Sequence, residues 1–204
     1  HGSLSVVVSR QEVHPVRTLF DSWMLRGAWL HNTRWLMNDE FSLLEAQQSI
    51  HELIARHAPL TDALDAIAHW MGLRLADATV AFMRYDDKDG TLSLFPGERF
   101  SPRYTETLQR VPIGPDVASF GTCAHERCLV VTEDIASDPR WTPFREAALA
   151  EGVHACWSSP VIPSDGELLG TFGTYYPAPK RPTEGDNRHL RQAASLISLA
   201  LVRD

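Results

Sequence analysis

The sequence predicts an α+β domain built on an antiparallel sheet that carries helices on both faces. Two pairs of β-forming segments, within residues 78–95 and 154–176, are each joined by a short turn that contains Asp and Gly, which indicates two hairpins. Segments with apolar residues at helical spacing come before, between and after these hairpins. Because hairpin strands pair antiparallel, the surrounding helices are expected to cover the two faces of one sheet.

The N-terminal part of the chain predicts a helical arm outside this domain. Apolar residues recur at helical spacing over residues 16–37, and three tryptophans there stand six residues apart. A step of six rotates each indole by about 240° around a helix, so the three do not share a face, and some are expected to meet another chain or domain. We expect a tag remnant at residues 1–3, the arm at 4–40 and the domain at 41–204.

The expected elements of the domain follow from local signals. Pro59 separates the first two helices, and Thr61 is a candidate N-cap of the second. Residues with high β-propensity fill the hairpin strands, Gly152 ends the helix before the second hairpin, and Thr183 can cap the closing helix. In chain order we expect helices at 41–57 and 61–75, strands at 78–86 and 91–95, a surface excursion at 99–109, a helix at 118–127, a strand at 128–132, a helix at 142–151, strands at 154–162 and 168–176, and a helix at 183–201.

Composition and charge exclude several function classes. The chain has 204 residues, with 19 Lys and Arg against 26 Asp and Glu and a formal net charge of −7. No run of basic residues exceeds two, so we expect no nucleic-acid partner. No apolar stretch reaches the roughly 20 residues that span a bilayer and no signal peptide is visible, so we expect a cytoplasmic fragment without membrane contact. Three cysteines favour free thiols in a reducing compartment.

Two stretches of the sequence carry the motifs of a known domain family. Residues 111–141 contain IGP, GT at the start of a helix, EDI and DP-x-W, and residues 148–183 contain ACWS-x-P, LGTF and YY. Together with residues 51–68, these stretches make the chain resemble a GAF domain. More narrowly, the chain is similar to the GAF domains of bacterial multidomain cyclic di-GMP signalling proteins and of related sensor kinases.

The resemblance implies a PAS-related sheet of five or six antiparallel strands, with the terminal helices on one face and a small-molecule pocket on the other. It also implies a regulatory domain that is not itself an enzyme and that senses or dimerises beside a GGDEF, EAL or kinase output domain. The parent protein would then be a diguanylate cyclase or a cyclic di-GMP phosphodiesterase. From the helix pattern we further expect a homodimer formed through the N-terminal and closing helices.

Aromatic and small side chains are expected to converge over the sheet and line the pocket. Such a lining suits a small, partly apolar ligand, although the same aromatic residues would also suit a plain core. The cysteines and histidines between 123 and 156 have the donor types of a zinc site but not its usual spacing, so no metal or other cofactor is expected. Asp134 and Asp138 are expected to bond local backbone. The predicted lining is Phe120, Cys123, Trp141, Phe144, Trp157, Ser159, Thr171 and Tyr175.

Two alternatives remain open. Free methionine sulfoxide reductases are GAF proteins whose cysteines attack the sulfoxide and then form a disulfide, which requires an accessible thiolate. In those enzymes the first cysteine precedes the GT motif, where this chain has Phe120, so Cys123 is not a carried-over catalytic residue. The other alternative is a ligand-free dimerisation module, in which Phe120 and Trp157 would fill the pocket.

Overall fold

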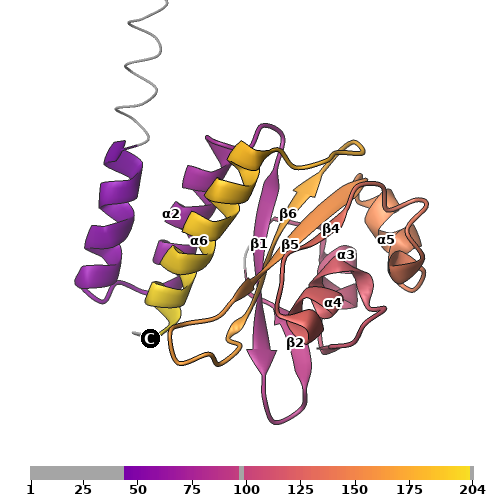
Figure 1. Ribbon diagram of the computed structural model, residues 1–204, viewed down its shortest axis with the longest axis horizontal. Coiled ribbons are helices and arrows are strands. Elements are labelled where there is room, and N and C mark those ends of the chain that lie inside the picture. Colours follow the sequence, from indigo (N-terminus) through magenta and orange to yellow (C-terminus); the bar gives the residue numbers. More distant parts are fainter. Residues whose placement is uncertain (1–43, 97–98, 203–204) are drawn as a thin grey trace, which may run out of the picture. The chain divides into compact units, whose positions relative to one another are not determined.

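The computed structural model describes residues 44–96 and 99–202, which fold into an antiparallel sheet with helices on both faces (Figure 1). The helices are 44–55, Leu60–Gly72 (α2), Pro102–Thr107 (α3), Ala118–Glu126 (α4), Arg145–Ala150 (α5) and Glu184–Val202 (α6), with a 3-10 helix at Pro139–Trp141 (η1). The strands are Thr79–Asp86 (β1), Thr91–Leu94 (β2), Val111–Pro112 (β3), Val130–Thr132 (β4), Ala155–Val161 (β5) and Gly170–Tyr176 (β6).

These strands form a six-stranded sheet in the order β3-β2-β1-β6-β5-β4, and every neighbouring pair is antiparallel. Both predicted hairpins are present, because β1 pairs with β2 and β5 pairs with β6. Helices α2 and α6 lie side by side against one face, and α4 packs on β4, β5 and β6 from the other (Figure 1). The predicted α+β class is therefore confirmed.

Strand alternation divides the interior into two cores, one on each face of the sheet. The core beneath α2 and α6 contains Trp70, Trp157 and Phe172. The core on the opposite face contains Phe120 and Cys156. Because Cys156 and Trp157 are neighbours on β5, their side chains point to opposite faces of the sheet. Only every other residue of a strand can therefore reach the core on the face of α4.

The start of α2 differs from the prediction by one residue. The carbonyl of Pro59 accepts hydrogen bonds from the backbone N–H groups of Asp62 at 2.9 Å and Ala63 at 3.3 Å, so the helix begins at Leu60. Thr61 thus lies inside the first turn and not at the N-cap, and its hydroxyl turns to Asp62. The cap predicted at Thr183 is confirmed, since its hydroxyl accepts from Asp186 N–H at 3.2 Å and Asp186 accepts in return from Thr183 N–H at 2.8 Å.

The surface excursion predicted at 99–109 contains a helix that the sequence analysis missed. Ser101 caps α3 by accepting from Tyr104 N–H at 3.3 Å, and Pro102 occupies its first turn. The helix carries one buried residue, Tyr104, so it has no apolar stripe that a periodicity argument could detect. The two-residue strand β3 was also missed; it pairs with β2 at the edge of the sheet.

The expectations for the arm at 4–40 and for the tag remnant at 1–3 lie outside the described residues. Within 44–96 and 99–202, no helix has the length and apolar character needed to cross a membrane.

Gly170 lets the two central strands approach each other. It has a φ of +158° and starts β6 opposite Arg84 of β1 and Val161 of β5. A Cβ atom at this position would lie 2.1 Å from the carbonyl oxygen of Met83. That oxygen belongs to the backbone of β1, so the clash can be relieved only by moving a strand.

Replacing Gly170 by Ala is therefore expected to destabilise the protein by about 2–4 kcal/mol, through backbone strain and overpacking. Gly72→Ala is the matched control, because a Cβ at Gly72 would have nothing within 4 Å. Urea unfolding of the full chain measures both variants. Equal stability of the two variants would contradict the close approach of β1 and β6.

Candidate functional site

Helix α4 is tied to the loop before it, and this fixes which side chains it turns toward the sheet. A Cβ atom at Gly121 would lie 2.6 Å from Cβ of Val117, so only glycine fits beneath the loop. The hydroxyl of Thr122 donates to the carbonyl of Pro115 at 3.0 Å. The IGP and GT motifs thus form one turn, which places Ser119 and Phe120 in the buried face of α4.

Phe120 fills the space between α4 and the segment that follows β4. Its ring lies edge-on to Trp141 with 5.5 Å between centroids, and edge-on to Phe144 with 5.2 Å. The side chains of Phe120 and Trp141 are 1% and 0% exposed. These three rings form an aromatic cluster, and in this structure Phe120 occupies its centre.

A polar network holds Trp141 in that cluster. The indole N–H donates to Thr132 Oγ1 at 3.0 Å, and the Thr132 hydroxyl donates to Asp138 Oδ2 at 2.8 Å. Asp138 also accepts from Arg140 Nε at 3.0 Å and from Arg140 N–H at 2.9 Å. Burial raises the pKa of the Asp138 carboxyl, but the hydrogen bonds from Arg140 and Thr132 outweigh it and hold the pKa below its usual value.

The acidic residues near this network have structural roles, as predicted. Asp138 caps η1, and Asp134 accepts from the backbone N–H of Ala136 at 3.0 Å. Both carboxylates therefore shape the turn that carries Trp141.

Beside the aromatic cluster lies a group of buried hydroxyls that we call the hydroxyl cluster, made of Tyr104, Ser119, Thr171 and Tyr175. Each of these oxygens is buried and has no hydrogen-bond partner. The hydroxyls of Ser119 and Tyr175 lie close enough to the sulfur of Cys156 to lower the pKa of its thiol, but a thiol sulfur is only a weak hydrogen-bond partner. Burial raises the pKa of Tyr104 and of Tyr175 well above the usual value, so both hydroxyls stay protonated.

The orientation of Tyr175 depends on Gly173. A Cβ atom at Gly173 would lie 2.7 Å from the Tyr175 ring and 2.9 Å from its hydroxyl oxygen. The ring therefore lies back along β6 over Gly173, toward Thr171 on the same face of the strand. This brings hydroxyls of β6 together with Ser119 of α4 around Cys156.

Phe100 covers the cluster on the side of α3. Its ring is edge-on to Tyr104 at 5.1 Å and to Tyr175 at 5.0 Å between centroids. Phe100 and Tyr175 also line an open pocket of about 210 Å³, which Arg99 and Glu151 border. Phe100 is half-buried, so its side chain lies between this outer pocket and the buried hydroxyls.

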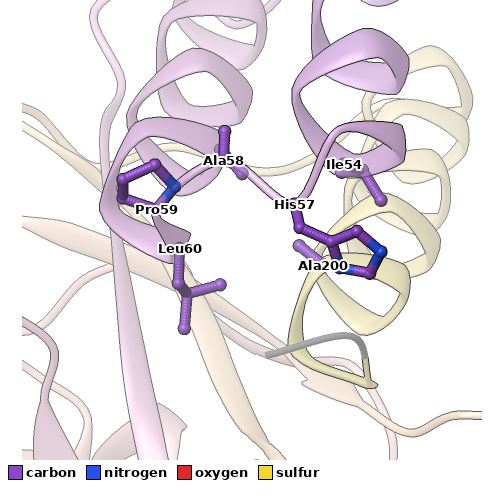
Figure 2. A pocket seen from close by; sticks show the side chains of 7 residues that line it. Ile54, His57, Ala58, Pro59, Leu60 and Ala200 are labelled. Carbon is purple, nitrogen blue, oxygen red and sulfur yellow. The ribbon is translucent and has the colours of Figure 1, made fainter.

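Two further hollows border α6, and the groove between α6 and β5 includes Asn187, whose Oδ1 is buried without a hydrogen-bond partner. A pocket of about 300 Å³ lies between the helix at 44–55, the start of α2 and the end of α6, and His57 supplies its one polar side chain (Figure 2). A groove of about 440 Å³ runs between α6 and β5 and is lined by Leu129, Ser159 and Leu190 among others. Neither contains a buried hydroxyl group comparable to the hydroxyl cluster.

The structure brings together most of the predicted lining but separates two residues from it. Trp157 belongs to the core beneath α2 and α6, and Ser159 lines the groove beside α6. Both alternate with Cys156 and Ser158 on β5 and therefore point away from the hydroxyl cluster. The residues on the face of α4 are Phe120, Cys123, Trp141, Phe144, Thr171 and Tyr175.

Sequence reasoning missed four residues near the cluster: Phe100, Tyr104, Ser119 and Ser158. Ser158 could have been found from strand alternation, because it shares a face with Cys156 and lies 3.7 Å from its sulfur. Ser119 precedes Phe120 in the GT-containing turn and could have been included with it. Phe100 and Tyr104 lie in the segment interpreted as a surface excursion, where no pattern marked them.

The three thiols differ in exposure, and none is activated. Cys123 and Cys156 are buried, and Cys128 is exposed. Burial raises the pKa of Cys123 well above its usual value and that of Cys156 to about 11. Partial burial and Glu126 raise the pKa of Cys128 as well. Within the residues that the structure describes, no group of three or more metal-binding side chains is found.

Comparison with known proteins identifies the fold. A family model described as "GAF domain" matches residues 57–202. A methyl sulfide methyltransferase-associated sensor of Methanosarcina acetivorans is 25% identical over 159 residues, which is 78% of this chain and only 16% of the relative.

Solved structures with low sequence identity share the fold. The substrate complex of free methionine-R-sulfoxide reductase from Neisseria meningitidis has a TM-score of 0.60 and 18% identity over 79% of this chain and 89% of its own. A domain of a putative two-component sensor histidine kinase from Sinorhizobium meliloti has a TM-score of 0.58 and 17% identity over 71% of this chain and 92% of its own.

The raised pKa values and the burial of the cysteines predict slow thiol chemistry. At pH 7.5 we expect Ellman's reagent to modify only Cys128 quickly in the native protein, with Cys123 and Cys156 reacting at the rate of unfolding. Cys128→Ser should abolish the fast phase, and in guanidinium all the thiols should react. If the Cys128→Ser variant still reacted in a fast phase, Cys123 or Cys156 would have to be accessible, which would contradict the packing around α4.

Proposed function

Because the chain belongs to the GAF domain family, we propose that it is a sensory domain that binds a small, uncharged, hydrogen-bonding molecule at the hydroxyl cluster. The observation that carries this proposal is the set of buried oxygens without partners on Tyr104, Ser119, Thr171 and Tyr175. A buried hydroxyl without a partner costs about 1–3 kcal/mol, so such oxygens are normally satisfied by protein, water or ligand. A ligand with several donors and acceptors would satisfy them together.

The chemistry of the cluster selects against a charged ligand. Among the residues of the hydroxyl cluster none carries a charge, and burial raises the pKa of Tyr104 and Tyr175 because the site disfavours an anion. Arg99 and Glu151 border the outer pocket, and Glu151 is close enough to Tyr104 to raise the pKa of its hydroxyl further. The aromatic rings next to the cluster suit a ligand with an apolar side.

Binding requires a change at an aromatic side chain. Phe100 lies between the outer pocket and the hydroxyls, and Phe120 fills the space beneath α4. Rotation of Phe100 would open the shorter route, because it is half-buried whereas Phe120 is 1% exposed. A ligand that binds the open arrangement better would shift the population toward it, and α4, which packs on β5 and β6, would respond.

We place the domain in a larger cytoplasmic signalling protein. The motif resemblance supports a cyclic di-GMP context, in which a GGDEF, EAL or kinase domain acts as output and the GAF domain regulates it. A relative that is named a sensor supports the sensory role, and the chain spans 16% of that relative's length. The cyclase or phosphodiesterase activity would then belong to the parent protein and not to this domain.

The reductase alternative lacks a suitable thiol in this chain. The position before GT holds Phe120, and the two buried cysteines have raised pKa values, whereas sulfoxide attack needs an accessible thiolate. The ligand-free dimerisation module is favoured by the dense aromatic cluster around Phe120. A ligand-free module would carry no bound molecule, whereas a sensory domain would bind one at the hydroxyl cluster.

Tyr175→Phe should separate folding from ligand binding. Removing a hydroxyl that has no partner is expected to leave the empty protein as stable as before, or slightly more stable. The same change removes one hydrogen bond to a ligand, worth about 1 kcal/mol, so affinity should fall roughly fivefold to tenfold. Native mass spectrometry of freshly purified full chain identifies a bound molecule, and thermal shift with that molecule compares the variants.

Tyr85→Phe is the control, since Tyr85 is a half-buried residue of β1 outside the hydroxyl cluster. It should keep the thermal shift of the wild type. If no extra mass is bound and a panel of uncharged polar metabolites gives no shift, the ligand proposal fails and the ligand-free module is favoured.

The proposed homodimer could use the exposed apolar side chains of α6. Leu199 and Val202 are 40% and 61% exposed there. We expect the full chain to be a dimer at micromolar concentration and Leu199→Glu to raise the fraction of monomer, because it buries a charge at the interface. His125→Glu is the control, because His125 is exposed on α4, on the other face of the sheet from α6. Light scattering that gives a monomer for the wild type would refute the dimer.

A further inference from the structure

The closing helix α6 is joined to the end of α2 by a contact between a histidine and an arginine. Arg74 follows α2, and its Nη1 lies 3.0 Å from Nε2 of His189, which is in the second turn of α6. A guanidinium group has only donors and stays protonated in proteins, so Nε2 must accept this hydrogen bond. His189 is therefore neutral here and carries its proton on Nδ1.

The hydrogen-bonded pair has few compensating contacts. Within the described residues, no carboxylate forms an ion pair with Arg74. Its guanidinium instead lies over the ring of Trp70, 4.7 Å from the centroid. Arg74 Nε and His189 Nδ1 are both buried without a hydrogen-bond partner. The pair thus has one hydrogen bond between its members and little else to compensate an added charge.

We propose that the Arg74–His189 contact is a pH-sensitive contact between α2 and α6. Protonation of His189 would break it and loosen the first half of α6 from α2. A proton on Nε2 would place two donors face to face and add a second positive charge beside Arg74. Both changes would act on the contact between α2 and α6, because these two helices pack directly against each other. Protonation would therefore favour an arrangement in which the start of α6 moves away from Arg74.

The electrostatic surroundings of His189 agree with this direction. Burial lowers the pKa of the His189 imidazole below its usual value, and Arg74 from the end of α2 and Arg188 from α6 lower it further. Asp186, also on α6, acts in the opposite sense and does not reverse the shift. The unfolded chain thus binds this proton more readily than the folded chain.

The sign of the pH effect follows. A histidine whose pKa is lowered on folding contributes stability above its unfolded pKa, about 6.5, and that stability is lost as the pH falls below it. The loss should appear first in the contact between α2 and α6. Since α6 is also the helix proposed to dimerise, the proton would act on the helix of the proposed interface.

The test combines nuclear magnetic resonance with hydrogen exchange on the full chain. Long-range ¹H–¹⁵N spectra should show the Nδ1–H tautomer of His189 at pH 7.5 and a midpoint of its titration below about 6.5, the usual value for histidine. Amide exchange in the α6 turn that follows His189, corrected for the intrinsic pH dependence, should become faster relative to the β6 amides between pH 7.5 and 5.5. Urea unfolding should show a shift of the midpoint to lower urea over the same range.

His189→Gln retains an acceptor for Arg74 but does not titrate, so it should remove the extra loss of stability and of α6 protection. His125→Gln is the matched control: His125 is exposed on α4, on the other face of the sheet, and its substitution should leave both effects in place. Arg74→Gln removes the facing charge and should shift the His189 titration to higher pH. An Nε2–H tautomer, or equal pH profiles for wild type and His189→Gln, would overturn the proposal.

Discussion

The strand β6 is buried along its whole length, and the rest of the domain depends on this burial. It lies between β1 and β5, with α2 and α6 over one face and α4 over the other. A strand enclosed in this way must supply apolar side chains to the helix layer and can supply polar ones only where a partner exists. Phe172 follows the first requirement, whereas the hydroxyls of Thr171 and Tyr175 have no partner on the face of α4, and that of Tyr176 has none on the opposite face.

The oxygens on the face of α4 would set the hydrogen-bonding chemistry of the proposed site, and the aromatic cluster beside them would limit the size of a ligand. In the proposed site, buried neutral hydroxyls would discriminate by hydrogen-bond pattern, since a ligand that lacks a matching donor or acceptor would leave a buried group unpaired. Phe120 restricts the size of what can enter, because its ring packs against both Trp141 and Phe144. The network from Thr132 to Arg140 holds Trp141 and so fixes one wall of the site.

Much of the fold could be predicted from the sequence, because the hairpins and long helices have strong periodicity and clear turn residues. The helix α3 could not, because its single buried residue, Tyr104, leaves no repeat to detect. Six of the eight residues predicted to line a pocket lie on the face of α4, and Trp157 and Ser159 do not. Alternation along β5 decides that Cys156 and Trp157 face apart, but which face meets α4 depends on how the sheet packs, and local patterns do not report that. The hydroxyls without partners come from α3, α4 and β6, so no local pattern in the sequence indicates that they meet.

The close approach of Tyr175 to Gly173 also constrains how this domain can change over generations. Any side chain at position 173 would overlap the Tyr175 ring in its present position, so a substitution there requires the ring to rotate away or to be replaced first. The reverse order is open, since a smaller residue at 175 leaves glycine acceptable. Changes at positions 173 and 175 should therefore be coupled, because loss of the Tyr175 ring makes room for a side chain at 173.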